Sequence, residues 1–125
     1  MSTSVGYTGK ILTVNLSRTS YNQEKLDQNI ARHYLGGSAL CTWLLAGMNW
    51  KKDPFDPGID LVFATGPITG TPAPSSARYV VASKSPLTGG WGEAHASGYW
   101  GPELKYAGFD AILVQGKAES PVYLW

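Results

Sequence analysis

Arg78 and the glycine-rich stretch after it are the part of this sequence best suited to chemistry. Arg78 stands at the head of a β-type run, residues 79–82, and a Pro/Gly loop follows at 84–92. A small-residue segment, 94–98, then leads to a short helix that Gly108 would end. Because a strand, a glycine-rich loop and a helix N-terminus let backbone N–H groups approach an anion, this order predicts an anion or cofactor platform. The alternative is a small α/β domain with a mobile loop.

Several side chains could have a chemical function, and for each of them a purely structural role is the alternative. Arg78 carries a permanent, forked positive charge that could clamp a phosphate or form a strand-end ion pair. His95, between two alanines, could donate to a ligand or be a loop histidine. Lys84 is predicted to be solvated rather than to add charge beside Arg78, and His33 to lie on a helix surface. Cys41 lies among apolar residues, which favours a buried, inert thiol.

The sequence holds no recognised catalytic or metal-ligating motif. It contains no P-loop, HExxH or CxxC. The dinucleotide-binding motif GxGxxG needs three glycines. Gly90 and Gly92 supply the first two, but the third position is His95, so a dinucleotide-binding fold is not favoured. Glu93 and Glu103 lie too far apart in the sequence to be expected as a catalytic pair. We therefore assign no catalytic and no metal-ligating residue.

Composition excludes several classes of function. The 125 residues suit one domain, and the net charge of +1 gives no basic field for nucleic acid or a membrane surface. No apolar run reaches the roughly 18 residues of a membrane span, and the N-terminus does not resemble a signal peptide. Cys41 is the single cysteine, so no internal disulfide is expected. The cytoplasm is the default compartment.

An unusually apolar surface is also expected. Charged residues make up 15% of the chain, against about 25% in typical domains. The chain stops at Trp125 within an apolar, strand-like run. We therefore expect an incomplete N-terminal domain, covered by the rest of a longer protein or by a partner.

The hydrophobic pattern predicts an α+β fold that is mainly β-sheet, with about three short helices. Residues 9–16 alternate as a half-buried strand. Asp27 is a good N-cap for a first helix, Gly36-Gly37 ends it, Ser38 can cap a second helix, and Pro102 suits the first turn of a third. Further strands are predicted at 20–24, 60–65 (buried on both faces), 78–83, 109–115 and 122–125. The uncharged, proline-rich loop at 66–77 is long enough to favour a functional role.

Specific short motifs run in order across nearly the whole chain. They are GKILTVNL (9–16), YLGGSAL (34–40), DPFDP (53–57), LVFATGPITGTPAPSSARY (61–79), KSPLTGG (84–90) and GYWGPELKYAGFDAILVQGKAESPVYLW (98–125). This combination resembles the N-terminal domain of the tungsten-containing aldehyde ferredoxin oxidoreductase family.

The resemblance implies a cofactor and an activity. Members hold one tungsten or molybdenum between two pterins, beside a [4Fe-4S] cluster that downstream domains bind. They oxidise aldehydes to carboxylates and pass the electrons to ferredoxin. The N-terminal domain is the floor under the bis-pterin cofactor, with two β-sheets related by a pseudo-twofold. The implied partners are ferredoxin and the remainder of the same enzyme or its other subunits, and a homodimer is compatible with the resemblance.

Three residues carry over from the family by position. Arg78 matches its pterin-contacting arginine. His95 stands where the family pattern has an asparagine, and Ser97 where it has a glycine; both positions contact the cofactor there. An imidazole can still donate one hydrogen bond, whereas Ser97 adds a side chain where the backbone approached closely. These departures indicate a divergent branch with an uncertain substrate.

Three alternatives remain open at this point. One is a stand-alone, non-catalytic module that binds a pterin or a protein partner. Another is the metal-bearing subunit of a related reductase complex, and a third is an unrelated phosphate-binding α/β domain. Under the enzyme hypothesis, the 125 residues alone are expected to be inactive, because they contain no cluster ligands.

Overall fold

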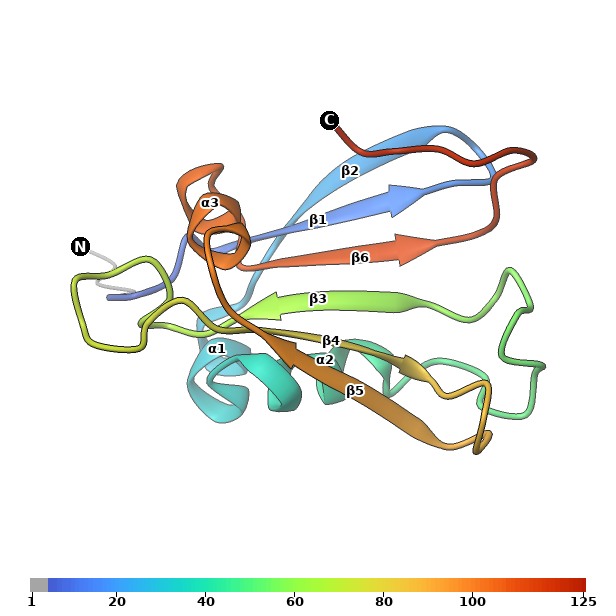
Figure 1. Ribbon diagram of the computed structural model, residues 1–125, viewed down its shortest axis with the longest axis horizontal. Coiled ribbons are helices and arrows are strands. Elements are labelled where there is room, and N and C mark those ends of the chain that lie inside the picture. The colour runs from blue at the N-terminus through green and yellow to red at the C-terminus, as the bar shows by residue number, and fades with distance from the viewer. Residues whose placement is uncertain (1–4) are drawn as a thin grey trace.

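The computed structural model describes residues 5–125, which form one six-stranded mixed sheet and three short helices (Figure 1). The α+β class predicted from the sequence is confirmed. The second, pseudo-twofold-related sheet that the resemblance implies is not present among these residues. The strands are β1 (Lys10–Asn15), β2 (Ser20–Lys25), β3 (Leu61–Thr65), β4 (Tyr79–Lys84), β5 (Trp91–Ala96) and β6 (Ala111–Gln115), and the helices are α1 (Gln28–Tyr34), α2 (Gly37–Leu45) and α3 (Trp100–Tyr106).

The sheet has the order β2-β1-β6-β3-β4-β5. β1 and β2 form an antiparallel hairpin, while β6 pairs parallel to β1 and antiparallel to β3. β3, β4 and β5 continue as an antiparallel series to the other edge. The first and last strands therefore pair in the middle of the sheet, and β5 forms the edge on which the site residues lie.

The two faces of the sheet have different cores. One face packs against α1 and α2, and Figure 1 shows these helices together along β3–β5. The other face packs against α3 and is smaller, with Val14, Leu104 and Ile112 at its centre. Strand alternation produces this division, as β1 shows: Ile11 faces α1 and α2, whereas Leu12 and Val14 face α3.

The helix boundaries largely follow the predicted signals. Asp27 caps α1 by accepting a hydrogen bond from the Asn29 N–H at 2.7 Å. The predicted Ser38 cap is wrong: α2 begins at Gly37, with Gly36 as its N-cap and no side-chain hydrogen bond.

In the part of the chain that the structure describes, no helix is long and apolar enough to cross a membrane.

Three strand predictions need correction. The loop at 84–92 does not lead into a helix, because Trp91–Ala96 first returns as β5 against β4 around a tight turn. Residues 122–125 are not a strand, since they have no strand partner among residues 5–125. The run at 60–65 is not buried on both faces: Val62 is fully buried, but Leu61 is 36% exposed on the other side.

A buried ion pair fastens the N-terminal segment to the sheet. Lys105 Nζ lies 2.7 Å from Asp110 Oδ1, and the two side chains are 9% and 2% exposed. Asp110 also accepts hydrogen bonds from the Thr8 N–H, the Thr8 hydroxyl and the Gly9 N–H, at 2.7–3.1 Å. Lys105 donates a second hydrogen bond to the Gly6 carbonyl at 2.6 Å. Lys105 and Asp110 of the ELKYAGFDA sequence (103–111) therefore bind residues 6–9 through a polar network.

Candidate cofactor-binding site

The β4–β5 hairpin brings the three candidate residues to one corner of the sheet. Val80 pairs with His95 and Tyr79 with Ala96. Arg78 comes immediately before β4 and Ser97 immediately after β5, so both flank the last rung of this ladder. This placement is compatible with a shared site, and cofactor contact by these residues stays a prediction.

Arg78 is exposed, and its guanidinium forms no ion pair with any residue from 5 to 125. The strand-end ion pair considered from the sequence is therefore not found there. Its backbone is held instead, because the Arg78 carbonyl accepts a hydrogen bond from Thr69 Oγ1 at 3.0 Å. Arg78 therefore combines a fixed backbone with an exposed guanidinium that has no ion pair among residues 5–125. This combination suits the binding of an anionic group.

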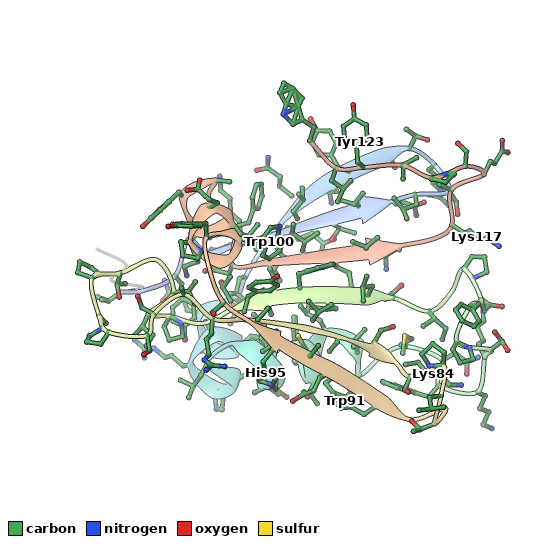
Figure 2. All side chains as sticks on the ribbon, in the orientation of Figure 1. Lys84, Trp91, His95, Trp100, Lys117 and Tyr123 are labelled. Atoms are coloured by element: carbon green, nitrogen blue, oxygen red, sulfur yellow. The ribbon has the colours of Figure 1, made fainter. Side chains whose placement is uncertain are left out.

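His95 lies in a short polar network on the outer edge of the sheet (Figure 2). Its Nε2 is 3.0 Å from Glu93 Oε1, and its side chain is 46% exposed. The other oxygen of Glu93 accepts a hydrogen bond from Trp91 Nε1 at 2.9 Å, and Ser38 Oγ donates to Glu93 Oε1 at 3.3 Å. The hydrogen bonds from His95 and then Trp91 lower the pKa of Glu93, so the carboxylate is ionised and orients the ring.

The first turn of α2 approaches the same corner. A Cβ on Gly37 would lie 3.4 Å from Val80 Cγ2, and one on Gly36 would lie only 2.5 Å from the Thr65 carbonyl oxygen. Only glycine allows the chain to pass this closely at Gly36, where φ is +159°. No side chain caps α2, and the Ser38 hydroxyl in its first turn donates to the ionised Glu93.

The loop at 66–77 borders the corner and is tied down at its base. Gly70 N–H donates to the Ser76 carbonyl at 3.0 Å, and Tyr106 of α3 donates to the Gly70 carbonyl at 2.9 Å. Gly101 allows α3 to pack closely, because a Cβ there would lie 3.2 Å from both the Ala77 carbonyl and Thr69. The GPITGT motif (66–71) in this loop thus packs against the GYWGPELKY motif (98–106), which contains α3.

Lys84 does not belong to this corner. It is buried at the other end of β4 (Figure 2), where its ammonium donates to the Trp50 carbonyl at 2.8 Å and to the Lys52 carbonyl. The prediction of a solvated lysine is therefore wrong. Two backbone carbonyls from residues 50–52 compensate for the loss of water, and the sequence around Lys84 gives no sign of them.

The remaining titratable candidates behave as ordinary structural residues. Cys41 is fully buried, and burial, with a smaller effect of Glu93, raises the pKa of its thiol to about 12. It is an inert core thiol, as predicted. His33 is exposed on α1, as predicted, with Nδ1 2.7 Å from the Asn29 carbonyl.

A broad groove lies on the other face of the sheet. It has a volume of about 1410 Å³ and is lined by β1, β2, β6, α3 and the segment 117–125. Trp100 stands at its side, with ring centroids 4.5 Å from Tyr79 and 5.2 Å from Phe63 (Figure 2). The large apolar side chains of Tyr123, Leu124 and Trp125 are exposed there. This face accounts for the apolar surface expected from composition.

The described residues contain no cluster of His, Cys, Asp or Glu that could hold a metal ion. Three supporting residues were not identified from sequence: Thr69, Glu93 and Trp100. For Glu93, a carboxylate two residues before His95 in an alternating strand was an available signal, because both side chains then share a face.

Comparison with known proteins identifies the family. Residues 11–125 match the family described as "Aldehyde ferredoxin oxidoreductase, N-terminal domain". The tungsten-containing aldehyde ferredoxin oxidoreductase of Pyrococcus horikoshii is 50% identical over 121 residues, which cover 96% of this chain and 20% of that protein. The aliphatic sulfonate oxidoreductase, WOR-like subunit, of Pyrococcus furiosus is 39% identical over 123 residues, covering 95% and 19%.

A solved structure agrees with this assignment. The active site complex BamBC of benzoyl coenzyme A reductase, in complex with 1,5-dienoyl-CoA, matches with a TM-score of 0.93 and 36% identity. The match covers 96% of this chain and 18% of that one. The chain thus spans about a fifth of the length of its curated relatives. It belongs to the family of aldehyde ferredoxin oxidoreductase N-terminal domains.

Proposed function

We propose that residues 1–125 form the pterin-binding floor of a tungsten-containing oxidoreductase, and that Arg78, His95 and Ser97 face the cofactor. The observation that carries this proposal is the exposed Arg78 guanidinium, which has no ion-pair partner among residues 5–125. The uncapped N-terminus of α2 lies against Thr65 and Val80, which belong to the strands on either side of the loop that ends at Arg78. A phosphate-bearing pterin matches the charge of Arg78, while the ionised Glu93 at this corner is already bonded to His95, Trp91 and Ser38.

The residues of this corner fit such a group by charge and by hydrogen bonding. Arg78 would bind an anionic edge of the cofactor through its forked N–H donors. His95 would present its Nδ1, because Glu93 holds Nε2. Ser97 supplies a hydroxyl at the end of β5. When bound, the metal and its pterins supply the redox chemistry, and this segment only binds, orients and excludes water.

The relatives suggest the reaction of the complete protein. Curated relatives with 44–50% identity are tungsten-containing aldehyde ferredoxin oxidoreductases. We therefore propose oxidation of an aldehyde to a carboxylic acid, with ferredoxin in the cytoplasm as electron acceptor. In this proposal the [4Fe-4S] cluster is bound by a part of the protein outside these 125 residues, and the apolar groove faces that part or a second copy.

A second candidate function is supported by the solved structure. Benzoyl coenzyme A reductase is a complex, and its BamBC structure matches this fold with a TM-score of 0.93. The chain could thus belong to the metal-bearing subunit of a related reductase rather than to an aldehyde oxidoreductase. Substrate assays distinguish the two, because only the first oxidises simple aldehydes with a viologen dye as electron acceptor.

The test uses the intact protein that contains this chain, produced anaerobically with tungstate or molybdate. We expect about one metal per polypeptide and aldehyde-dependent reduction of benzyl viologen. Arg78→Ala should lower the metal content, with a change in melting temperature no larger than an exposed arginine causes. Arg18→Ala, at an exposed turn, is the matched control. Full metal content in Arg78→Ala would contradict the proposal.

A further inference from the structure

Thr69 connects the loop at 66–77 to the backbone of Arg78. Its side chain is almost completely buried, at 4% exposure. Its hydroxyl accepts a hydrogen bond from the Gly66 N–H at 3.0 Å and donates one to the Arg78 carbonyl at 3.0 Å. One oxygen atom therefore joins the end of β3 to the start of β4, twelve residues further along the chain.

The surroundings of Thr69 keep this hydroxyl in place. Thr69 N–H donates to the Gly66 carbonyl at 3.2 Å, which closes a tight turn. The methyl group packs against α3, since a Cβ on Gly101 would lie 3.2 Å from Thr69 Cγ2. With its backbone and methyl group both fixed, the hydroxyl has little freedom to turn away from Arg78.

We propose that Thr69 is a positioning residue for the cofactor site: it fixes the backbone of Arg78 and thereby the place from which the guanidinium reaches the cofactor. This inference rests on the proposed function of Arg78. The Arg78 side chain is exposed and has no ion pair among the described residues, so its backbone is the part that the fold constrains. A side-chain hydroxyl is required for this role because the same group must accept one hydrogen bond and donate another.

The experiment is a double-mutant cycle on the intact, metal-loaded protein. Thr69→Val keeps the shape but removes the hydroxyl, and Thr69→Ser keeps the hydroxyl but removes the methyl group. Each is made alone and together with Arg78→Ala. The rate at which tungsten leaves the protein is measured by metal analysis after gel filtration, and the melting temperature is recorded separately.

Positioning predicts a non-additive result. Alone, Thr69→Val should speed tungsten loss about fivefold or more, because small displacements of a binding group are costly. Combined with Arg78→Ala, it should add less than about twofold, since its effect acts through the arginine. Thr69→Ser should stay within about twofold of the parent protein. Thr69→Val should lower the melting temperature by the same amount whether residue 78 is arginine or alanine.

Other outcomes overturn the inference in distinguishable ways. An equal acceleration of tungsten loss by Thr69→Val with and without Arg78 would show a merely structural role. Rapid tungsten loss in Thr69→Ser would exclude the hydroxyl as the cause, even if Thr69→Val failed to fold. Unchanged tungsten loss in Arg78→Ala itself would refute the proposed function, and the role of Thr69 with it.

Discussion

Replacing Lys105 with methionine should destabilise the protein strongly, because Lys105 is half of a buried ion pair. Methionine has nearly the length of lysine but no charge. The change removes a 2.7 Å ion pair to Asp110 and a 2.6 Å hydrogen bond to the Gly6 carbonyl. It also removes the cation from its position 5.6 Å from the Tyr7 ring centroid. Burial, together with the nearby Asp110 charge, raises the pKa of Tyr7, so its phenol stays neutral.

The magnitude follows from what remains around Asp110. Breaking a buried ion pair by removing one partner costs about 3–5 kcal/mol, because the other charge stays buried without compensation. Here Asp110 keeps three donors, two backbone N–H groups and the Thr8 hydroxyl. We therefore expect Lys105→Met to lie near the lower end, about 3 kcal/mol. Asp110→Ala leaves the Lys105 ammonium with only the Gly6 carbonyl and leaves the three other donors without their acceptor, so it should cost more, about 4–5 kcal/mol.

The assay is reversible urea unfolding of the intact protein, with hydrogen exchange at Thr8 and Gly9 as a local measurement. Lys52→Met is the matched control. It breaks the Lys52–Asp56 pair, whose partners are 42% and 35% exposed, and exposed pairs contribute at most about 1 kcal/mol. Exchange should accelerate at Thr8 and Gly9 in Lys105→Met but not in Lys52→Met.

A small effect would refute this reasoning. If Lys105→Met lowered the free energy of unfolding by no more than Lys52→Met, the ion pair could not be a principal fastening of residues 6–9. An unchanged exchange rate at Thr8 and Gly9, despite a large loss of global stability, would place the effect elsewhere in the fold.

Three further predictions concern single sites. Because burial raises the pKa of the Cys41 thiol to about 12, iodoacetamide should label Cys41 at pH 8 only at the rate of unfolding, which mass spectrometry can measure. Burial also raises the pKa of Asp60, so the folded state holds its proton more tightly than the unfolded state and ionisation costs stability as the pH rises. Asp60→Asn should therefore raise the melting temperature at pH 7 and leave it nearly unchanged at pH 3; the same shift at both would contradict this cause. Gly36→Ala should cost about 2 kcal/mol or more in urea unfolding, since its Cβ would lie 2.5 Å from a carbonyl oxygen, whereas Gly47→Ala meets nothing within 4 Å and should be near neutral.

Local patterns predicted the elements that depend on local causes. The alternation in residues 9–16 became β1, and Asp27 caps α1, because burial on one face and a side-chain cap are determined within a few residues. β5 was missed since its sequence, WGEAHA, has few residues that favour strands, and pairing with β4 makes it a strand. Residues 122–125 are the reverse case: they favour a strand but lack a partner among the described residues.

The candidate site shows the same limit. Arg78 and His95 could be identified as candidates from their place next to a glycine-rich stretch, and the family resemblance added Ser97. Two contacts come from further along the chain: Thr69 donates to the Arg78 carbonyl, and Ser38 of α2 donates to Glu93, the partner of His95. Such contacts depend on strand register and loop closure, which a local pattern does not specify.

The ion pair and the cofactor corner meet at the loop that carries Thr69. A Cβ on Gly6 would lie only 2.6 Å from the Pro67 carbonyl oxygen, so residues 6–9 pack directly against the loop at 66–70. Lys105 binds the Gly6 carbonyl on one side, and Thr69 binds the Arg78 carbonyl on the other. The buried pair thus supports the loop from the side away from the corner. It follows that Lys105→Met should loosen the cofactor only when it unfolds this loop, whereas Thr69→Val should loosen it in a protein that remains folded.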